Sequence, residues 1–121
     1  KIVFALFVAH GPTTYEPVQV EHELGDGEHL DWLGGARVIH APGHCKGQIC
    51  LLWPREGGVV IAADAASNMF GLDFMICHED FPVAARTLSR LCELSFEHAV
   101  FGHGGPISGG ASERFRGKFS Q

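Results

Sequence analysis

The stretch VIHAPGHCKGQIC at positions 38–50 guides the interpretation of the whole chain. Its apolar ends belong to two runs, 36–41 and 49–53, that predict β-strands. The Pro-Gly pair between them indicates a turn, and His44 follows it directly. Imidazole is a common metal ligand, and small neighbouring residues leave room for an ion and its water. The stretch therefore predicts two strands joined by a loop that presents a candidate ligand.

Two further segments share this pattern of a predicted strand followed by a metal-capable side chain. Asp64 follows the apolar run 59–63, and His103 follows the run 98–101. Side chains at the ends of neighbouring strands converge on one edge of a sheet, so these two could meet His44 there. Two His and one Asp suit Zn²⁺ or non-haem iron. Each residue taken alone is also common in turns, caps or flexible loops, so both interpretations stay open.

The remaining patterns predict an α/β chain. Apolar runs bounded by turn residues predict strands at 2–9, 18–23, 30–33, 36–41, 49–53, 59–63 and 98–101. Glycine-rich turns between successive runs favour hairpins, and therefore an antiparallel or mixed sheet. Helical spacing predicts a helix over 81–94, with Asp80 as its N-cap, and a short helix from about Ser112. We find no linker or repeat, so residues 1–121 are expected to form a single domain.

Composition narrows the classes of partner and compartment. Nine Lys and Arg against fourteen Asp and Glu give a net charge of −5, which argues against binding to nucleic acid or an anionic membrane. No apolar run approaches the ~20 residues that span a bilayer. The four cysteines form no C-x-x-C pair, which favours a reduced, cytoplasmic setting. The chain begins at Lys1 and not at Met, so we expect that something upstream is missing.

The three loops together resemble a known family. The stretch at 38–50, VVIAADA at 59–65 and FGHG at 101–104 resemble the metallo-β-lactamase fold superfamily. The resemblance runs from about Leu24 to Phe119. It implies the C-terminal part of an αββα sandwich, with an antiparallel or mixed sheet and helices on one face. The family's usual upstream H-x-H-x-D-H segment is absent from this sequence.

The resemblance implies metal ligands as well as a fold. It makes His44 a ligand of a first metal ion, Asp64 a carboxylate that bridges two ions, and His103 a ligand of the second. Family members typically hold two zinc ions, sometimes iron or manganese. The sequence departs from the family at Cys45, usually Thr or Ser, and at Ala63, usually Gly. A reduced thiol at Cys45 could ligate a metal or become oxidised.

The implied function is metal-dependent hydrolysis, in which a metal-bound hydroxide attacks an ester, thioester, lactone or related bond. The three residues offer each ion two protein ligands, whereas stable zinc sites use three or four. We therefore expect an incomplete site that takes a small-molecule substrate only when completed, and we assign no other catalytic residue here. In this chain alone the site could be without metal.

Two alternatives remain open. One is a non-catalytic, truncated module that dimerises or binds a partner. The other is a mononuclear iron dioxygenase of the same fold. Half of a sandwich would expose the apolar inner face of its sheet, so we expect a homo-oligomer or an N-terminal segment to cover that face. His40 lies mid-strand and could face either layer, whereas four other histidines are expected to face solvent or cap elements: His22, His29, His78 and His98.

Overall fold

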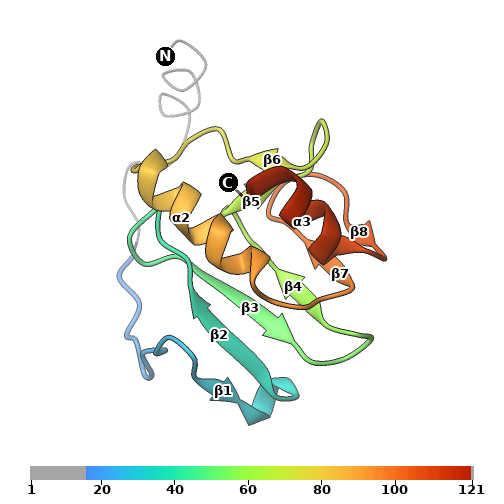
Figure 1. Cartoon of the computed structure of the whole chain (residues 1–121). Coiled ribbons are helices and arrows are strands. Elements are labelled where there is room, and N and C mark those ends of the chain that lie inside the picture. Colours follow the sequence, from blue (N-terminus) through green and yellow to red (C-terminus); the bar gives the residue numbers. More distant parts are fainter. Residues whose placement is uncertain (1–15, 121) are drawn as a thin grey trace.

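The computed structural model describes residues 16–120. The predicted strand at 2–9 lies outside the described residues. Within them, six strands form one mixed sheet in the order β1-β2-β3-β4-β7-β8 (Figure 1). Their bounds are β1 His29–Leu30, β2 Ala36–His40, β3 Ile49–Trp53, β4 Val59–Ile61, β7 His98–Val100 and β8 Ile107–Ser108. A separate hairpin pairs β5, Ala66–Ser67, with β6, Asp73–Phe74. The predicted α/β class with a mixed sheet is confirmed.

Strand direction follows the connections along the chain. The first four strands pair as consecutive antiparallel hairpins, as the glycine-rich turns predicted. β4 and β7 then pair in parallel, because the chain between them leaves the sheet to form a helix. As a result β2, β4 and β7 all run in the same direction and end at the same edge of the sheet.

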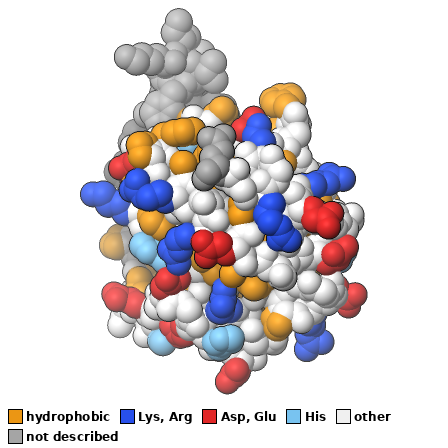
Figure 2. Space-filling view, viewed as in Figure 1, with side chains coloured by type: hydrophobic (Ala, Val, Ile, Leu, Met, Phe, Trp, Pro, Cys, Tyr) orange, Lys and Arg blue, Asp and Glu red, His pale blue; other side chains and the backbone are white. Residues whose placement is uncertain are grey.

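Two helices cover one face of the sheet (Figure 1). These are α2, Phe81–Cys92, and α3, Ala111–Phe119, close to the predicted ranges. The Asp80 side chain accepts a hydrogen bond from the Val83 N–H, which confirms the predicted N-cap. Buried residues of both helices, Leu88, Leu91 and Phe115 among them, pack on the sheet residues Cys50, Val60 and Ala99. The outward surface of this layer carries interspersed side chains of both charges (Figure 2).

The opposite face of the sheet also carries apolar side chains. Because side chains alternate along a strand, the residues next to Cys50 and Val60 point away from the helices. These are Leu51 and Trp53 of β3 and Val59 and Ile61 of β4, paired across the strands as Leu51 with Ile61 and Trp53 with Val59. No α-helix of the described residues lies on this face (Figure 1). Within residues 16–120, α-helices thus cover one side of the sheet only.

Two strand predictions are wrong. Residues 18–23 form no strand and are fully on the surface, with Val18 85% exposed, because no neighbouring strand pairs with this apparent alternation. Of residues 30–33 only Leu30 belongs to a strand, and Asp31–Leu33 forms the 3₁₀ helix η1. Gly34 ends that helix in a left-handed conformation, which turns the chain back toward β2.

The sequence patterns also missed β5, β6 and β8. Each has two residues, which is too short to produce a periodic signal. β4 ends at Ile61, earlier than predicted, because Ala63 has a positive φ of 45° that a strand cannot contain. None of the helices in the described residues is long and apolar enough to span a bilayer.

A candidate metal centre at the strand ends

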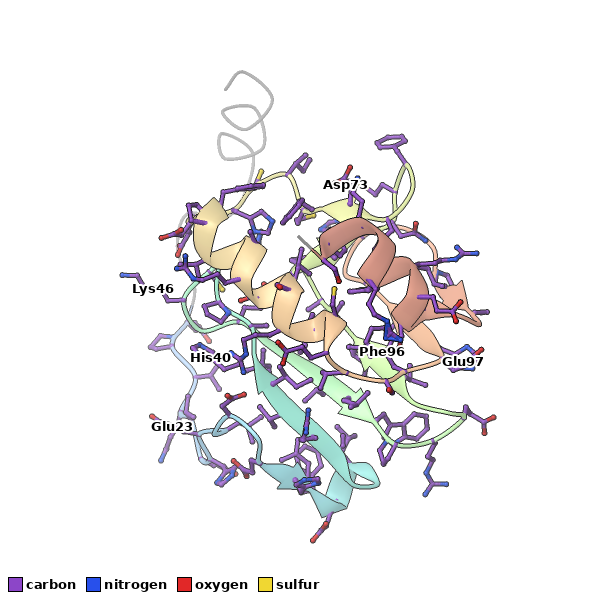
Figure 3. All side chains as sticks on the ribbon, viewed as in Figure 1. Glu23, His40, Lys46, Asp73, Phe96 and Glu97 are labelled. Carbon is purple, nitrogen blue, oxygen red and sulfur yellow. The ribbon has the colours of Figure 1, made fainter. Side chains whose placement is uncertain are left out.

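The His44 loop follows β2 and is fixed from two sides. Across its base, the Ala41 N–H donates to the Gln48 carbonyl at 2.8 Å. The His40 ring, which the sequence left facing either layer, is exposed and hydrogen-bonds the Lys46 carbonyl at 2.9 Å (Figure 3). These bonds hold the two ends of the loop together, so His44 is presented from a closed turn.

Helix α2 fixes the other side of this loop. The buried Thr87 hydroxyl donates to the Pro42 carbonyl at 2.7 Å. Gly43 lies so close to the backbone of Ala84 that an added Cβ would overlap it, and its φ of 135° also favours glycine. The Pro-Gly pair therefore lets the loop approach the helix closely, and this approach sets the position of His44.

Asp64 stands three residues beyond the end of β4. Ala63 precedes it in a left-handed conformation, and its carbonyl accepts the Gly102 N–H at 2.9 Å. A Cβ on Gly102 would collide with the Asp64 carboxylate. The sequence pattern of small residues beside each ligand thus has a structural reason here, since the carboxylate occupies the space above Gly102.

His103 stands three residues beyond the end of β7, the parallel neighbour of β4. Its carbonyl accepts the Asn68 N–H at 3.0 Å, and the Asn68 amide donates to the Gly105 carbonyl at 2.8 Å. The β5–β6 hairpin therefore holds the His103 loop in place. The equal offsets of Asp64 and His103 from two parallel strands bring both side chains to one edge.

The three predicted ligands lie around one carboxylate. The His44 Nε2 atom is 3.8 Å from Asp64 Oδ2, and the His103 Nε2 atom is 3.6 Å from Asp64 Oδ1. Both distances exceed a hydrogen bond. They are close to the separation of about 3.4 Å between two ligands that share a tetrahedral ion at about 2.1 Å. Each imidazole lies nearest to a different carboxylate oxygen, so the carboxylate stands between the two histidines.

Unpaired polar atoms support the same interpretation. His44 Nδ1 and Asp64 Oδ1 are buried and have no hydrogen-bond partner. Buried polar groups are normally paired, so the unpaired Asp64 Oδ1 calls for a ligand, whereas His44 Nδ1 is not the ring nitrogen that faces Asp64. The donor set of two imidazoles and a carboxylate fits Zn²⁺ or iron. Yet in residues 16–120 no group of three or more His, Cys, Asp or Glu side chains is arranged to hold a metal ion. The described residues thus bring two imidazoles to one carboxylate, and a metal site built on them would need further ligands.

His78 is a neighbour of this site that the sequence patterns missed. Its ring packs edge-on to His44 with centroids 6.0 Å apart, and Phe74 and Phe81 flank it at 6.1 Å. Both of its ring nitrogens are buried without a partner. Burial, followed by the nearby charge of His44, lowers the pKa of His78. The one available signal was its place between two aromatic residues just before the Asp80 cap.

The cysteine beside the site does not complete it. Cys45 is a free, exposed thiol, and the described residues contain no three-ligand group that includes it. Cys50, by contrast, lies in the core, where burial raises the pKa of its thiol to about 12. That thiol stays protonated, and it donates a hydrogen bond to the Ala62 carbonyl at 3.4 Å within the core.

Comparisons with known proteins find relatives at the level of structure. No protein-family model matches the chain, and no curated protein matches it significantly. A metallo-beta-lactamase family protein of Thermus thermophilus matches with a TM-score of 0.64 and 29% identity, over 94% of this chain and 42% of that one. A metallo-beta-lactamase superfamily protein of the archaeon Sulfolobus tokodaii matches with a TM-score of 0.63 and 21% identity, over 93% and 44%. The chain spans less than half the length of either structure.

Proposed function

Because the chain has the metallo-β-lactamase fold, over a span consistent with its C-terminal portion, we propose that it supplies part of the metal site of a metal-dependent hydrolase. The observation that carries this proposal is the Asp64 carboxylate with His44 at one oxygen and His103 at the other. In the proposal His44 holds a first ion, His103 holds a second, and Asp64 bridges them. Zinc is the metal that this donor set favours, and iron or manganese are the alternatives.

Metal ions bound there would supply an activated water and stabilise the oxyanion that develops on an ester, thioester, lactone or related substrate. The residues of this chain orient the ligands for that task. Thr87 and Gly43 fix the His44 loop on α2, and Asn68 fixes the His103 loop. Because each ion receives two ligands from the described residues, the remaining ligands must come from elsewhere in a complete protein.

Metal binding by the chain tests the ligand assignment independently of activity. We expect equilibrium dialysis to show weak zinc binding, and cobalt to give the visible absorption of a nitrogen and oxygen site. Asp64→Ala removes the shared ligand, so it should weaken binding about tenfold or more. His29→Ala, at an exposed histidine of β1, is the matched control and should bind like the wild type. Equal binding by wild type and Asp64→Ala would contradict the proposal.

The metal content of a protein purified without chelators separates the hydrolase from the dioxygenase. Two equivalents of zinc, with turnover of an ester, thioester or lactone panel by a protein that contains the whole fold, support the hydrolase. One equivalent of iron without hydrolysis supports the mononuclear dioxygenase of the same fold. The substrate within the hydrolase class is set by residues on variable loops, so the panel must be broad.

A second candidate is a binding module that has no catalytic role, and the uncovered face of the sheet favours it. Trp32 is 76% exposed and Ile61 37% exposed, and with Leu33 and Trp53 they line an apolar hollow of about 370 Å³. We propose that a second copy of the chain covers this face when no other segment does. Light scattering at micromolar concentration should then give the mass of a dimer, and the mass of one chain would contradict it.

A further inference from the structure

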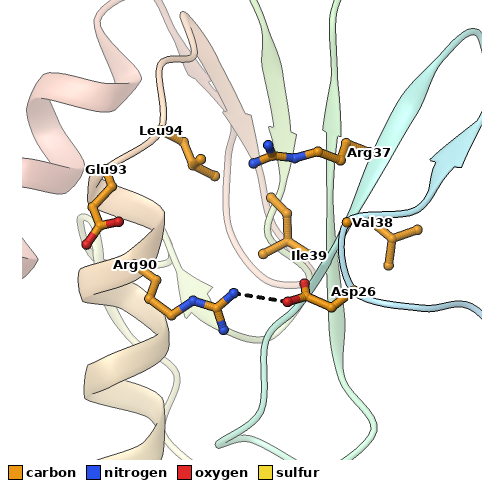
Figure 4. Close-up of a pocket in the computed structure, with 8 residues that line it drawn as sticks. Asp26, Arg37, Val38, Ile39, Arg90, Glu93 and Leu94 are labelled. Carbon is orange, nitrogen blue, oxygen red and sulfur yellow. Dashed lines mark hydrogen bonds and ion pairs between the residues drawn. The ribbon is translucent and has the colours of Figure 1, made fainter.

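A second pocket lies between β2 and the end of α2, away from the three loops of the metal centre (Figure 4). Its volume is about 280 Å³, just below the range of about 300–1,000 Å³ that is usual for small-molecule sites. Arg37 and Ile39 of β2 form one wall, and Arg90 and Leu94 form the other. None of the residues that line it belongs to the His44, Asp64 or His103 loops.

Arg37 occupies a position where the fold predicts an apolar residue. It is two residues from Ile39, a core residue, so both side chains point to the helix-covered face of the sheet. Figure 4 shows the Arg37 side chain extending from β2 toward Leu94. His29 and Leu52 lie directly across from Arg37 on the neighbouring strands. A cation is thus placed between the two layers, and neither of its cross-strand neighbours is acidic.

The Arg37 guanidinium makes no ion pair with any described residue, and its Nε atom is buried without a hydrogen-bond partner. Charged groups inside proteins are normally paired, since an unpaired buried donor costs free energy. An anion in the pocket would remove that cost. The fork of N–H donors on a guanidinium matches the two oxygens of a carboxylate.

The acidic residues of the pocket do not fill this role. Asp26 Oδ1 accepts the His40 N–H at 2.7 Å, and Asp26 Oδ2 accepts a hydrogen bond from Arg90 at 3.2 Å. Glu93 lies on the opposite side of the pocket from Arg37 (Figure 4). Asp26 therefore pairs with Arg90 at the pocket wall, and the Nε donor of Arg37 stays unpaired.

We propose that this pocket binds a small organic carboxylate. Its oxygens accept hydrogen bonds from Arg37, and its carbon part rests on Ile39 and Leu94. Arg90, held by Asp26, is a second positive charge at the rim. The ligand class follows from the pocket, which combines a planar cationic fork, an apolar floor and a small volume.

The test uses butyrate as the probe and butyramide as its neutral counterpart, with the chain in a buffer that contains no carboxylate. Titration followed by NMR should give saturable shifts of the Arg37 side-chain Nε–H and the backbone amide of Ile39 with butyrate. Butyramide should give no saturable shift. The absence of saturation with butyrate, or equal binding of butyramide, would overturn the proposal.

Variants locate the binding site. Arg37→Gln should weaken butyrate binding about tenfold, because the charged fork is lost. Arg86→Gln, at an exposed arginine of α2 outside this pocket, should leave the binding unchanged. Arg37→Lys keeps the charge without the fork, and should retain part of the affinity if Arg37→Gln fails to fold. Unchanged affinity in Arg37→Gln or full affinity in Arg37→Lys would contradict recognition by the guanidinium.

Discussion

Ala63 adopts a backbone conformation that costs free energy but positions the next residue, Asp64. Its φ of 45° lies in the left-handed region, which disfavours residues with a Cβ by about 1–2 kcal/mol. The conformation is needed because the chain must leave β4 sharply to place Asp64 above Gly102. The family that the sequence resembles usually has glycine at this position.

Ala63→Gly should therefore stabilise the fold. Part of the relieved strain is offset by the greater entropy of glycine in the unfolded chain, so we expect a net gain of about 0.5–1 kcal/mol. Urea unfolding at equilibrium measures it. Ala65→Gly, at a buried neighbour without a positive φ, is the control and should destabilise. A loss of stability in Ala63→Gly would show that the alanine methyl contributes more packing than strain.

At the scale of elements, the sequence patterns predict the long helices and strands correctly and miss the short ones. The helix over 81–92 and the strands at 36–40 and 49–53 are long enough for periodicity to identify them. The two-residue strands depend on tertiary pairing and leave no local pattern. The segment at 18–23 has apolar and polar residues in alternation, as in a strand, but forms no strand because no neighbouring strand pairs with it.

An ion pair between α3 and β6 should make the stability of the fold depend on pH. Lys118 Nζ donates to Asp73 Oδ2 at 2.9 Å. This hydrogen bond, together with one from the Phe74 N–H, lowers the pKa of Asp73 below its ordinary value. A carboxyl whose folded-state pKa is lowered stabilises the fold above its unfolded pKa, and this stabilisation is lost as the pH falls through the folded pKa.

Melting temperatures from pH 6 down to about pH 3 should therefore fall less steeply for Asp73→Asn than for the wild type. Both partners are largely exposed, so the difference should be small and should shrink in high salt. Asp31→Asn, at an exposed aspartate that forms no ion pair among the described residues, should follow the wild-type curve. Identical slopes for wild type and Asp73→Asn would show that the ion pair contributes nothing.

At the scale of the whole molecule, the candidate site could be predicted because strand direction determines it. Parallel pairing of β4 with β7 places Asp64 and His103 at one edge of the sheet. Because β3 is antiparallel to both β2 and β4, β2 ends at the same edge, where it presents His44. The position of His78 beside His44 and Phe74 could not be predicted, since these contacts depend on how an irregular loop folds. The unpaired Arg37 likewise becomes visible only when both layers are in place.

We expect the molecule to associate through the sheet face that no α-helix of residues 16–120 covers. Leu51, Trp53, Val59 and Ile61 form paired rows on this face, next to the hollow beneath Trp32. Burial of such a surface in a stable interface typically removes on the order of 1,000 Å² or more from water. A charge placed at its centre should therefore oppose association, because a desolvated lysine has no acidic partner there.

Ile61→Lys tests this expectation. The side chain is 37% exposed, so the folded chain can accommodate the lysine, while a dimer that buries the face cannot. Sedimentation or light scattering over a concentration series should show weaker association than in the wild type. Ile76→Lys is the matched control, because Ile76 is 79% exposed and lies outside the rows of this face. If both variants associate like the wild type, association uses another surface; if both are weakened alike, the loss reflects charge in general and not this face.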